Sequence, residues 1–196
     1  MPKLASRRVV LQFVATAAVF TAVVGPAVAA DPAQIVQRTA QQVIEIVKTK
    51  TGADRQAAIL GVLQANFDMP AMARVALGTH WNTATEQERA RFLKAVATAE
   101  AKAYSERFGQ YGGQTLTIGK VTPRTNGAII VDSRLNQTSG QPIKLEWEVR
   151  GDRITDVKVE GVSMVMTRRS DFNSYIQNHG GKVEPLVSEL EARAAR

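Results

Sequence analysis

The sequence of 196 residues contains no cysteine and only two histidines. Without cysteine there is no disulfide framework, so the fold must be stabilised by packing alone. His80 and His179 lie far apart in the sequence, and neither has a partner at the spacing of metal ligands. The sequence therefore predicts no metal site.

Aromatic residues make up only 6% of the chain and are not interleaved with arginines. The formal net charge is +7, and the basic residues form no dense stripe of the kind that nucleic-acid-binding proteins present. The first thirty residues carry three basic and no acidic side chains, so their removal lowers the charge to +4. We therefore expect no nucleic-acid partner.

Long hydrophobic runs are also scarce. The run at residues 9–24 has about 16 residues, fewer than the roughly 20 that a membrane-spanning helix needs. Basic residues precede it, and small residues at 27–30 suit signal peptidase. We predict a signal peptide over residues 1–30 and a single exported domain over 31–196. The general secretory route is favoured, although Ser6–Leu11 resembles a twin-arginine motif.

Motifs of catalysis are missing as well. There is no glycine-rich phosphate loop, and residues 161–165 have Val165 where a serine-hydrolase elbow needs glycine. Glu146 and Glu148 share the outer face of a predicted strand with Lys144, which is typical of a solvated ladder. The sequence predicts a protein without enzymatic activity and without a cofactor.

The first half of the remaining chain has helical periodicity. Asp31-Pro32 resembles a capped helix start, and Thr85–Glu88 forms a capping box. The spacing of apolar residues predicts a helix from Pro32 to about Lys50, a second one ending at Phe67, a short one ending at Gly78, and a long one over about 86–110. Residues 79–82 are expected to form a loop.

From Gln114 onward the period of the apolar residues becomes two. It predicts strands over 116–121, 129–135, 143–149 and 154–166, separated by glycine-containing turns, and two short helices after Phe172. Segregated helices and strands indicate an α+β fold, in which the helices cover one curved face of a four-stranded antiparallel sheet. We expect an arrangement like that of nuclear transport factor 2 or the cystatins.

The last strand is predicted to cross the interior. Residues 162–166 are almost continuously apolar, so both of their faces should be covered. Met164 and Met166 are flexible side chains that suit an irregular apolar surface. The same residue types would serve an ordinary filled core or a binding cavity, and composition does not separate these two possibilities.

Three clusters carry a resemblance to a known family. They are Phe67-Asp68-Met69 followed by Met72–Gly78; Trp81, Thr85–Phe92, Tyr104 and Tyr111; and Val159–Met164 followed by Arg168-Arg169-Ser170-Asp171-Phe172. In this order they resemble the MlaC family, the toluene-tolerance auxiliary component of a lipid ABC transporter. The Arg168-Arg169 pair departs from the tyrosine-arginine pair that is commoner in that family.

The resemblance implies a periplasmic shuttle that maintains outer-membrane lipid asymmetry. Such proteins hold phospholipid acyl chains in a deep pocket between sheet and helices. They exchange lipid between an inner-membrane MCE-type ABC transporter and an outer-membrane lipoprotein–porin complex. A hopanoid-associated branch of the family leaves the cargo open. We expect a monomer that works by binding and handover.

The predicted lipid-binding residues are apolar positions expected to face inward. They are Met72, Leu77, Trp81, Phe92, Val96, Tyr104, Phe108, Leu116, Ile130, Leu145, Trp147, Val162, Met164 and Met166. Arg168 and Arg169, placed where the last strand should reach the surface, could attract an anionic head group.

Two other classes of protein remain open at this point. An interaction module or adaptor would have a filled core in place of a cavity. An enzyme on a similar cone-shaped fold would need a polar group inside the cavity, and Asp132 is the candidate that the sequence offers.

Overall fold

The computed structural model describes residues 31–109 and 111–195, so the predicted signal peptide lies outside the described residues. The helices are α1 (Pro32–Thr49), α2 (Gly52–Asn66), α3 (Met69–Leu77), α4 (His80–Thr83), α5 (Glu86–Phe108), α6 (Met164–Asn178) and α7 (Glu184–Ala195). The strands are β1 (Thr115–Pro123), β2 (Ile129–Asn136), β3 (Ile143–Arg150), β4 (Arg153–Val159) and β5 (Val162–Ser163). The α+β fold class is confirmed, with one short strand more than expected.

Local sequence signals explain where the helices start. Asp31 accepts a hydrogen bond from the Ala33 N–H, and Asp68 accepts one from the Ala71 N–H, with proline in the first turn in both cases. Thr85 and Glu88 form the reciprocal capping box predicted for α5. The segment expected to be a loop before α5 instead contains the single-turn helix α4.

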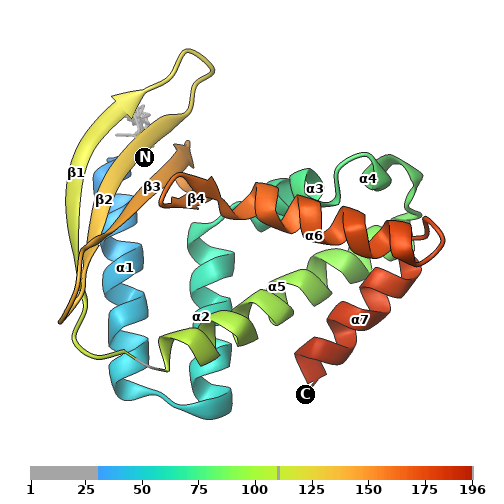
Figure 1. The fold of residues 1–196 in the computed structure, drawn as a ribbon, viewed down its shortest axis with the longest axis horizontal. Helices are drawn as coiled ribbons and strands as arrows, with labels where there is room; N and C mark the ends of the chain where they lie inside the picture. Colours follow the sequence, from blue (N-terminus) through green and yellow to red (C-terminus); the bar gives the residue numbers. More distant parts are fainter. Residues whose placement is uncertain (1–30, 110, 196) are drawn as a thin grey trace, which may run out of the picture.

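The sheet is an antiparallel meander in the order β1-β2-β3-β4-β5. The registers pair Ser133 with Leu145 and Leu145 with Val159, so these three residues cross the sheet on one face. α1 packs against β1 and β2 on that face, and α2 packs beside α1 (Figure 1). A core of Ile35 and Val36 from α1 and buried sheet residues joins the two layers.

The predicted long last strand is wrong beyond Val159. Glu160 and Gly161 both have positive φ, at 50° and 82°, and make a tight turn. Ser163 then caps α6, because its hydroxyl accepts from the Met166 N–H at 3.1 Å. The chain therefore turns back after β4 and begins a helix at Met164, instead of crossing the interior as a strand.

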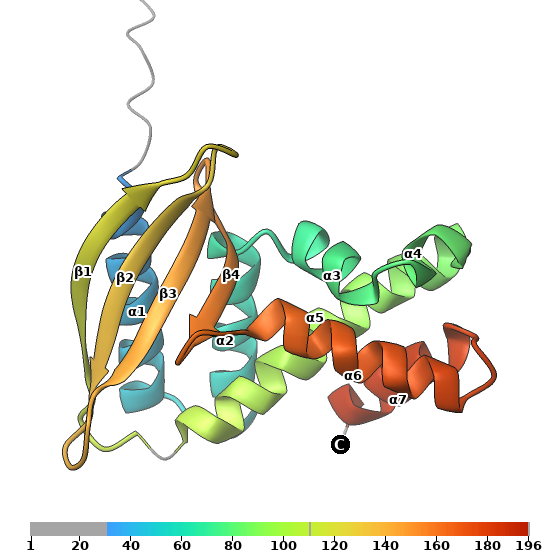
Figure 2. The ribbon, with the colours of Figure 1, turned by 45° about the horizontal axis from the view of Figure 1, so that its top comes forward.

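Beside the sheet, α3, α5, α6 and α7 form a helical layer that extends away from it. α5 passes from α2 to α7, and α3 lies beside α6 (Figure 2). Phe92, Phe172, Ile176, Leu186 and Val187 are buried there, and the rings of Phe92 and Phe172 meet edge to face at 5.6 Å. We call this cluster the C-terminal core.

An ion-pair network fastens α7 to α5. The guanidinium of Arg91 donates to Glu184 at 2.8 and 2.9 Å and to Glu191 at 2.7 and 3.0 Å. These hydrogen bonds raise the pKa of Arg91 and lower the pKa of Glu191 from their ordinary values. Each of the two carboxylates accepts two hydrogen bonds from the planar guanidinium of Arg91. Networks of this geometry are the surface ion pairs that contribute to stability.

We expect Arg91→Gln to lower the urea midpoint of unfolding at pH 7. The pKa of Glu191 is depressed in the folded protein, so its contribution exists above the ordinary glutamate value of about 4.3 and is lost as the pH falls through the folded value. The difference from the wild type should therefore shrink below about pH 4. Arg38→Gln, at an exposed arginine of α1, is the matched control. A difference that stays constant down to pH 3 would contradict this account.

Candidate functional site

A cavity of about 580 Å³ lies between the sheet and the helices. Its wall is formed by the inner face of β1–β4 and by residues of α1, α2, α3, α5 and α6. Most of these residues are aliphatic or aromatic, including Val43, Ile59, Leu63 and Val157. A cavity therefore lies beside the packed core of this half of the molecule.

The sheet side of the cavity contains a part-buried hydrogen bond between side chains of β2 and β3. The indole N–H of Trp147 donates to the hydroxyl of Ser133 at 2.8 Å, and Ser133 is almost fully buried. This bond satisfies the indole nitrogen, which would otherwise be costly to bury. It also fixes the ring of Trp147 at the wall, between Val131 and Val157 of the neighbouring strands.

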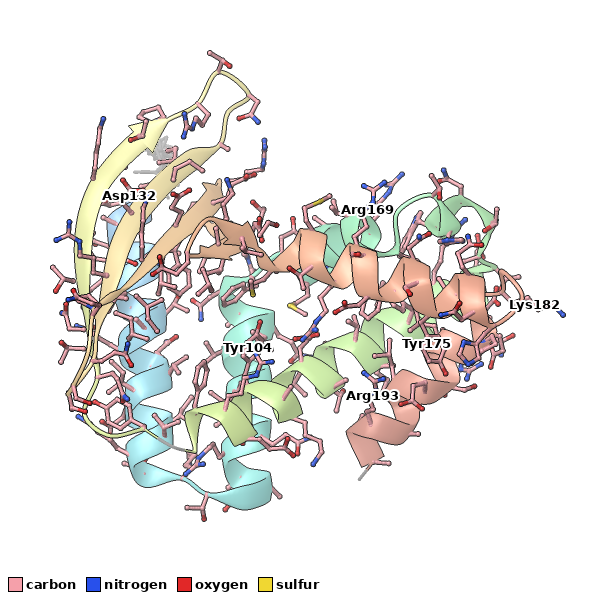
Figure 3. The ribbon with its side chains drawn as sticks, in the orientation of Figure 1. Tyr104, Asp132, Arg169, Tyr175, Lys182 and Arg193 are labelled. Carbon is pink, nitrogen blue, oxygen red and sulfur yellow. The ribbon has the colours of Figure 1, made fainter. Side chains whose placement is uncertain are left out.

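The α5 side of the cavity follows a four-residue spacing. Val96, Glu100, Tyr104 and Phe108 succeed one another along one face of α5, and all four line the cavity. The rings of Tyr104 and Phe108 stack with centroids 5.7 Å apart. Figure 3 shows Tyr104 where α5 passes α2. Burial raises the pKa of Tyr104, and the nearby Glu100 adds to this effect, so the phenol stays neutral.

A half-buried ion pair interrupts the apolar wall. Arg168 of α6 donates two hydrogen bonds to the carboxylate of Glu100, one of them at 3.0 Å, and a third to Asp171 at 3.3 Å. The bonds to Glu100 are the main cause of the raised pKa of Arg168. Because the guanidinium and the carboxylate satisfy each other, the wall carries no uncompensated charge at this place.

Eight of the fourteen predicted lipid-binding residues lie together in the cavity wall. They are Met72, Val96, Tyr104, Phe108, Leu116, Leu145, Trp147 and Met164. They come from α3, α5, β1, β3 and α6, which the fold brings around one space. Their contact with a ligand stays a prediction.

The other six predicted residues lie outside the wall. Leu77 and Phe92 are buried in the C-terminal core, and Trp81 packs against it, with Arg74 and Arg89 at 6.0 and 5.4 Å from its ring centroid. Ile130 is buried away from the cavity. Val162 and Met166 are 56% and 51% exposed, because the turn at Glu160-Gly161 and the start of α6 place them on the surface.

The two arginines proposed for a head group are in different surroundings. Arg168 lines the cavity but is already engaged by Glu100 and Asp171. Arg169 is exposed, and its guanidinium lies over Gly78, 3.1 Å from the position where a Cβ would stand. Figure 3 shows Arg169 on the side of α6 that faces away from α5.

Sequence reasoning missed several residues of the wall. Val43, Ile44 and Val47 of α1 and Val62 of α2 were recognisable as apolar helix faces, but nothing in the pattern distinguishes a face toward a cavity from a face toward a core. Glu100 had a signal that could have found it, because it stands four residues from both Val96 and Tyr104.

The cavity offers little for catalysis. Asp132, the candidate catalytic group, lines a separate depression on the sheet with Arg134 and Lys144 and is absent from the apolar wall. Within residues 31–109 and 111–195, no group of three or more histidines or carboxylates could hold a metal ion. In the same part of the chain, no helix is long and apolar enough to cross a membrane.

Comparison with known protein families identifies the family of this chain. A family model described as "MlaC protein" matches residues 37–192, which is most of the chain. The chain belongs to the MlaC family. The resemblance drawn from the sequence is thereby confirmed. MlaC proteins are non-catalytic lipid carriers of the periplasm.

A solved structure has the same fold. It is that of a phospholipid-binding protein from Ralstonia solanacearum, determined in complex with a phospholipid. The match has a TM-score of 0.72 and 19% sequence identity, and it covers 85% of this chain and 98% of the other. At this sequence identity the similarity establishes the fold alone. The ligand of this MlaC-family protein has to be inferred from its own residues.

Proposed function

We propose that this MlaC-family protein carries phospholipid through the periplasm, with the acyl chains held in the apolar cavity. The observation that supports the proposal is the cavity itself, about 580 Å³ in volume and walled by aliphatic and aromatic side chains. Such a space between sheet and helices suits a long hydrocarbon chain. Glu100 and Arg168 form an ion pair, so they add no net charge to the wall beside that chain.

The energetics agree with a carrier. Each methylene transferred from water to an apolar site contributes about 0.8 kcal/mol, so a buried chain can offset much of its removal from a bilayer. No bond is formed or broken, and no cofactor is required. Binding and handover are sufficient for transport.

The proposal extends to the organisation of the chain and to its partners. Residues 31–196 form one lipid-binding domain, exported after cleavage of residues 1–30. Lipid is exchanged with an MCE-type ABC transporter of the inner membrane and a lipoprotein–porin complex of the outer membrane, as in the family. Its direct lipid contacts are the eight predicted residues of the wall, Met72, Val96, Tyr104, Phe108, Leu116, Leu145, Trp147 and Met164.

Native mass spectrometry with lipid extraction tests the proposal. The full chain is expressed with its own leader and purified from the periplasm. We expect close to one phospholipid per chain. A mass that equals the bare polypeptide, unchanged after incubation with phospholipid vesicles, would contradict the carrier and favour an adaptor. Hopanoid in place of phospholipid would keep the carrier and correct its cargo.

A further inference from the structure

The charges in the cavity wall are unevenly compensated. Three charged side chains line the cavity, namely Glu100, Arg107 and Arg168. Glu100 and Arg168 bind each other, and Asp171 adds a second carboxylate to Arg168. Arg107 forms no ion pair within the described residues. The one uncompensated charge of the described wall is therefore positive and lies in the last turn of α5.

This arginine stands at the mouth of the cavity. Among the described residues of the wall, the exposed ones are Arg107, Phe108 and Gln137. Arg107 and Phe108 end α5, and Gln137 begins the turn between β2 and β3. Figure 2 shows both of these places at the lower end of the sheet half of the molecule. The cavity thus opens to solvent beside Arg107.

A second cation lies near the same end. The ammonium of Lys48, in the last turn of α1, is 5.9 Å from the centroid of the Tyr111 ring, and Tyr111 lines the cavity. Lys48 is exposed and forms no ion pair in the described part of the chain. Arg55 is nearby but donates to the backbone carbonyls of Lys50 and Ser105, which leaves it less free to bind a ligand.

We propose that Arg107 and Lys48 bind the phosphate of a glycerophospholipid whose acyl chains occupy the cavity, which rests on the carrier function proposed above. The planar guanidinium can donate two parallel hydrogen bonds to phosphate oxygens, and the ammonium adds a point charge. Neither cation has to break an existing ion pair to do so. This site differs from the one predicted at Arg168 and Arg169, where Arg168 is engaged by Glu100 and Asp171 and Arg169 is absent from the cavity wall.

The assignment decides between classes of cargo. A phosphodiester gains from two cations at the mouth, whereas a hopanoid or diacylglycerol has no phosphate to place there. At the same end, the Gln114 side chain accepts from the Gly112 N–H and the Gln137 side chain donates to the Gln141 carbonyl. The amide group of Gln114 and the carbonyl group of Gln137 can therefore still hydrogen-bond the uncharged part of a head group. Both cations are exposed, so we expect the preference for phosphate to weaken as salt is raised.

A competition experiment tests the site. Delipidated protein is incubated with vesicles that contain equal amounts of dioleoyl phosphatidylglycerol and dioleoylglycerol, which share the same acyl chains, and bound lipids are counted by native mass spectrometry. We expect the wild type to prefer the phospholipid by about tenfold and Arg107→Gln or Lys48→Gln to reduce that preference by about threefold to fivefold. Arg134→Gln, an exposed arginine that does not line the cavity, should leave it unchanged.

The outcomes separate this site from the carrier function. Binding of dioleoylglycerol reports that a variant is folded with its cavity intact, because that lipid needs no cation. Equal loading of both lipids by the wild type, or an unchanged preference in Arg107→Gln and Lys48→Gln, would overturn the head-group site and leave the carrier. If the wild type loaded neither lipid, the carrier function and the head-group site would fall together.

Discussion

Leu145→Glu is expected to lower the lipid bound per chain at least about tenfold, because an acyl chain would have to pack against a carboxylate or bury it unpaired. Leu145 lies in the middle of the sheet wall, between Ser133 and Val159 of the neighbouring strands. Without lipid the carboxylate can be hydrated by water in the cavity, so the loss of binding should exceed the loss of stability. Native mass spectrometry gives the bound lipid, and thermal unfolding gives the stability.

Val162→Glu is the matched control for this variant. Val162 is 56% exposed in the two-residue strand β5, so the same change of side chain there meets water. We expect its lipid load to equal that of the wild type. If Leu145→Glu retained its lipid while remaining folded, the ligand would lie elsewhere. If Val162→Glu lost its lipid, the surface beside β5 would have to take part in binding.

Glu100→Gln is expected to destabilise the protein by about 1–3 kcal/mol, because it leaves the half-buried Arg168 without its principal carboxylate. Asp171 remains, but its hydrogen bond to Arg168 is the longer one at 3.3 Å. Urea unfolding monitored by circular dichroism measures the change. The loss of stability should be larger than for a surface ion pair such as Lys102–Glu106.

A double variant tests whether the loss of stability in Glu100→Gln comes from the unpaired charge of Arg168. Glu100→Gln combined with Arg168→Tyr removes both charges and keeps a large side chain at position 168. We expect it to be more stable than Glu100→Gln alone, although it has lost one more native side chain. If the double variant lost as much stability as Glu100→Gln and Arg168→Tyr measured singly and added together, the pair would not be energetically coupled.

Much of the fold could be predicted because its signals are local. The caps at Asp31 and Thr85, the hairpin glycines and the alternation of residues in β3 each depend on a few neighbours in sequence. Helices followed by a meander leave few alternative topologies. The order of the elements and the antiparallel pairing were therefore within reach.

The segment from Val162 to Met166 was mispredicted for an identifiable reason. A short apolar run is compatible with a buried strand and with the first turn of a helix. The deciding interactions are tertiary, since Asp156 of β4 accepts hydrogen bonds from the Ser163 hydroxyl at 2.6 Å and from the Val165 N–H at 3.2 Å. These bonds hold the start of α6 against the sheet.

The candidate site was only partly predictable because cavity and core draw on the same side chains. Phe92 and Tyr104 occupy the same helix, yet one is fully buried against Phe172 and the other faces open space. Whether an aromatic residue is buried in a core or lines a cavity depends on whether another helix or strand fills the space opposite it. No sequence pattern singles out Arg107, because the role proposed for it depends on where the mouth of the cavity lies.

The length of α5 has a consequence for how this protein can change over time. Its first turns are anchored in the C-terminal core through Phe92, while its last turns present Tyr104, Arg107 and Phe108 to the cavity and its mouth. Substitutions that reshape the cargo space therefore fall on a different stretch of the helix from those that hold α7 in place. Related carriers can therefore acquire a different cargo through substitutions in the last turns of α5, while the packing of its first turns in the C-terminal core is unchanged.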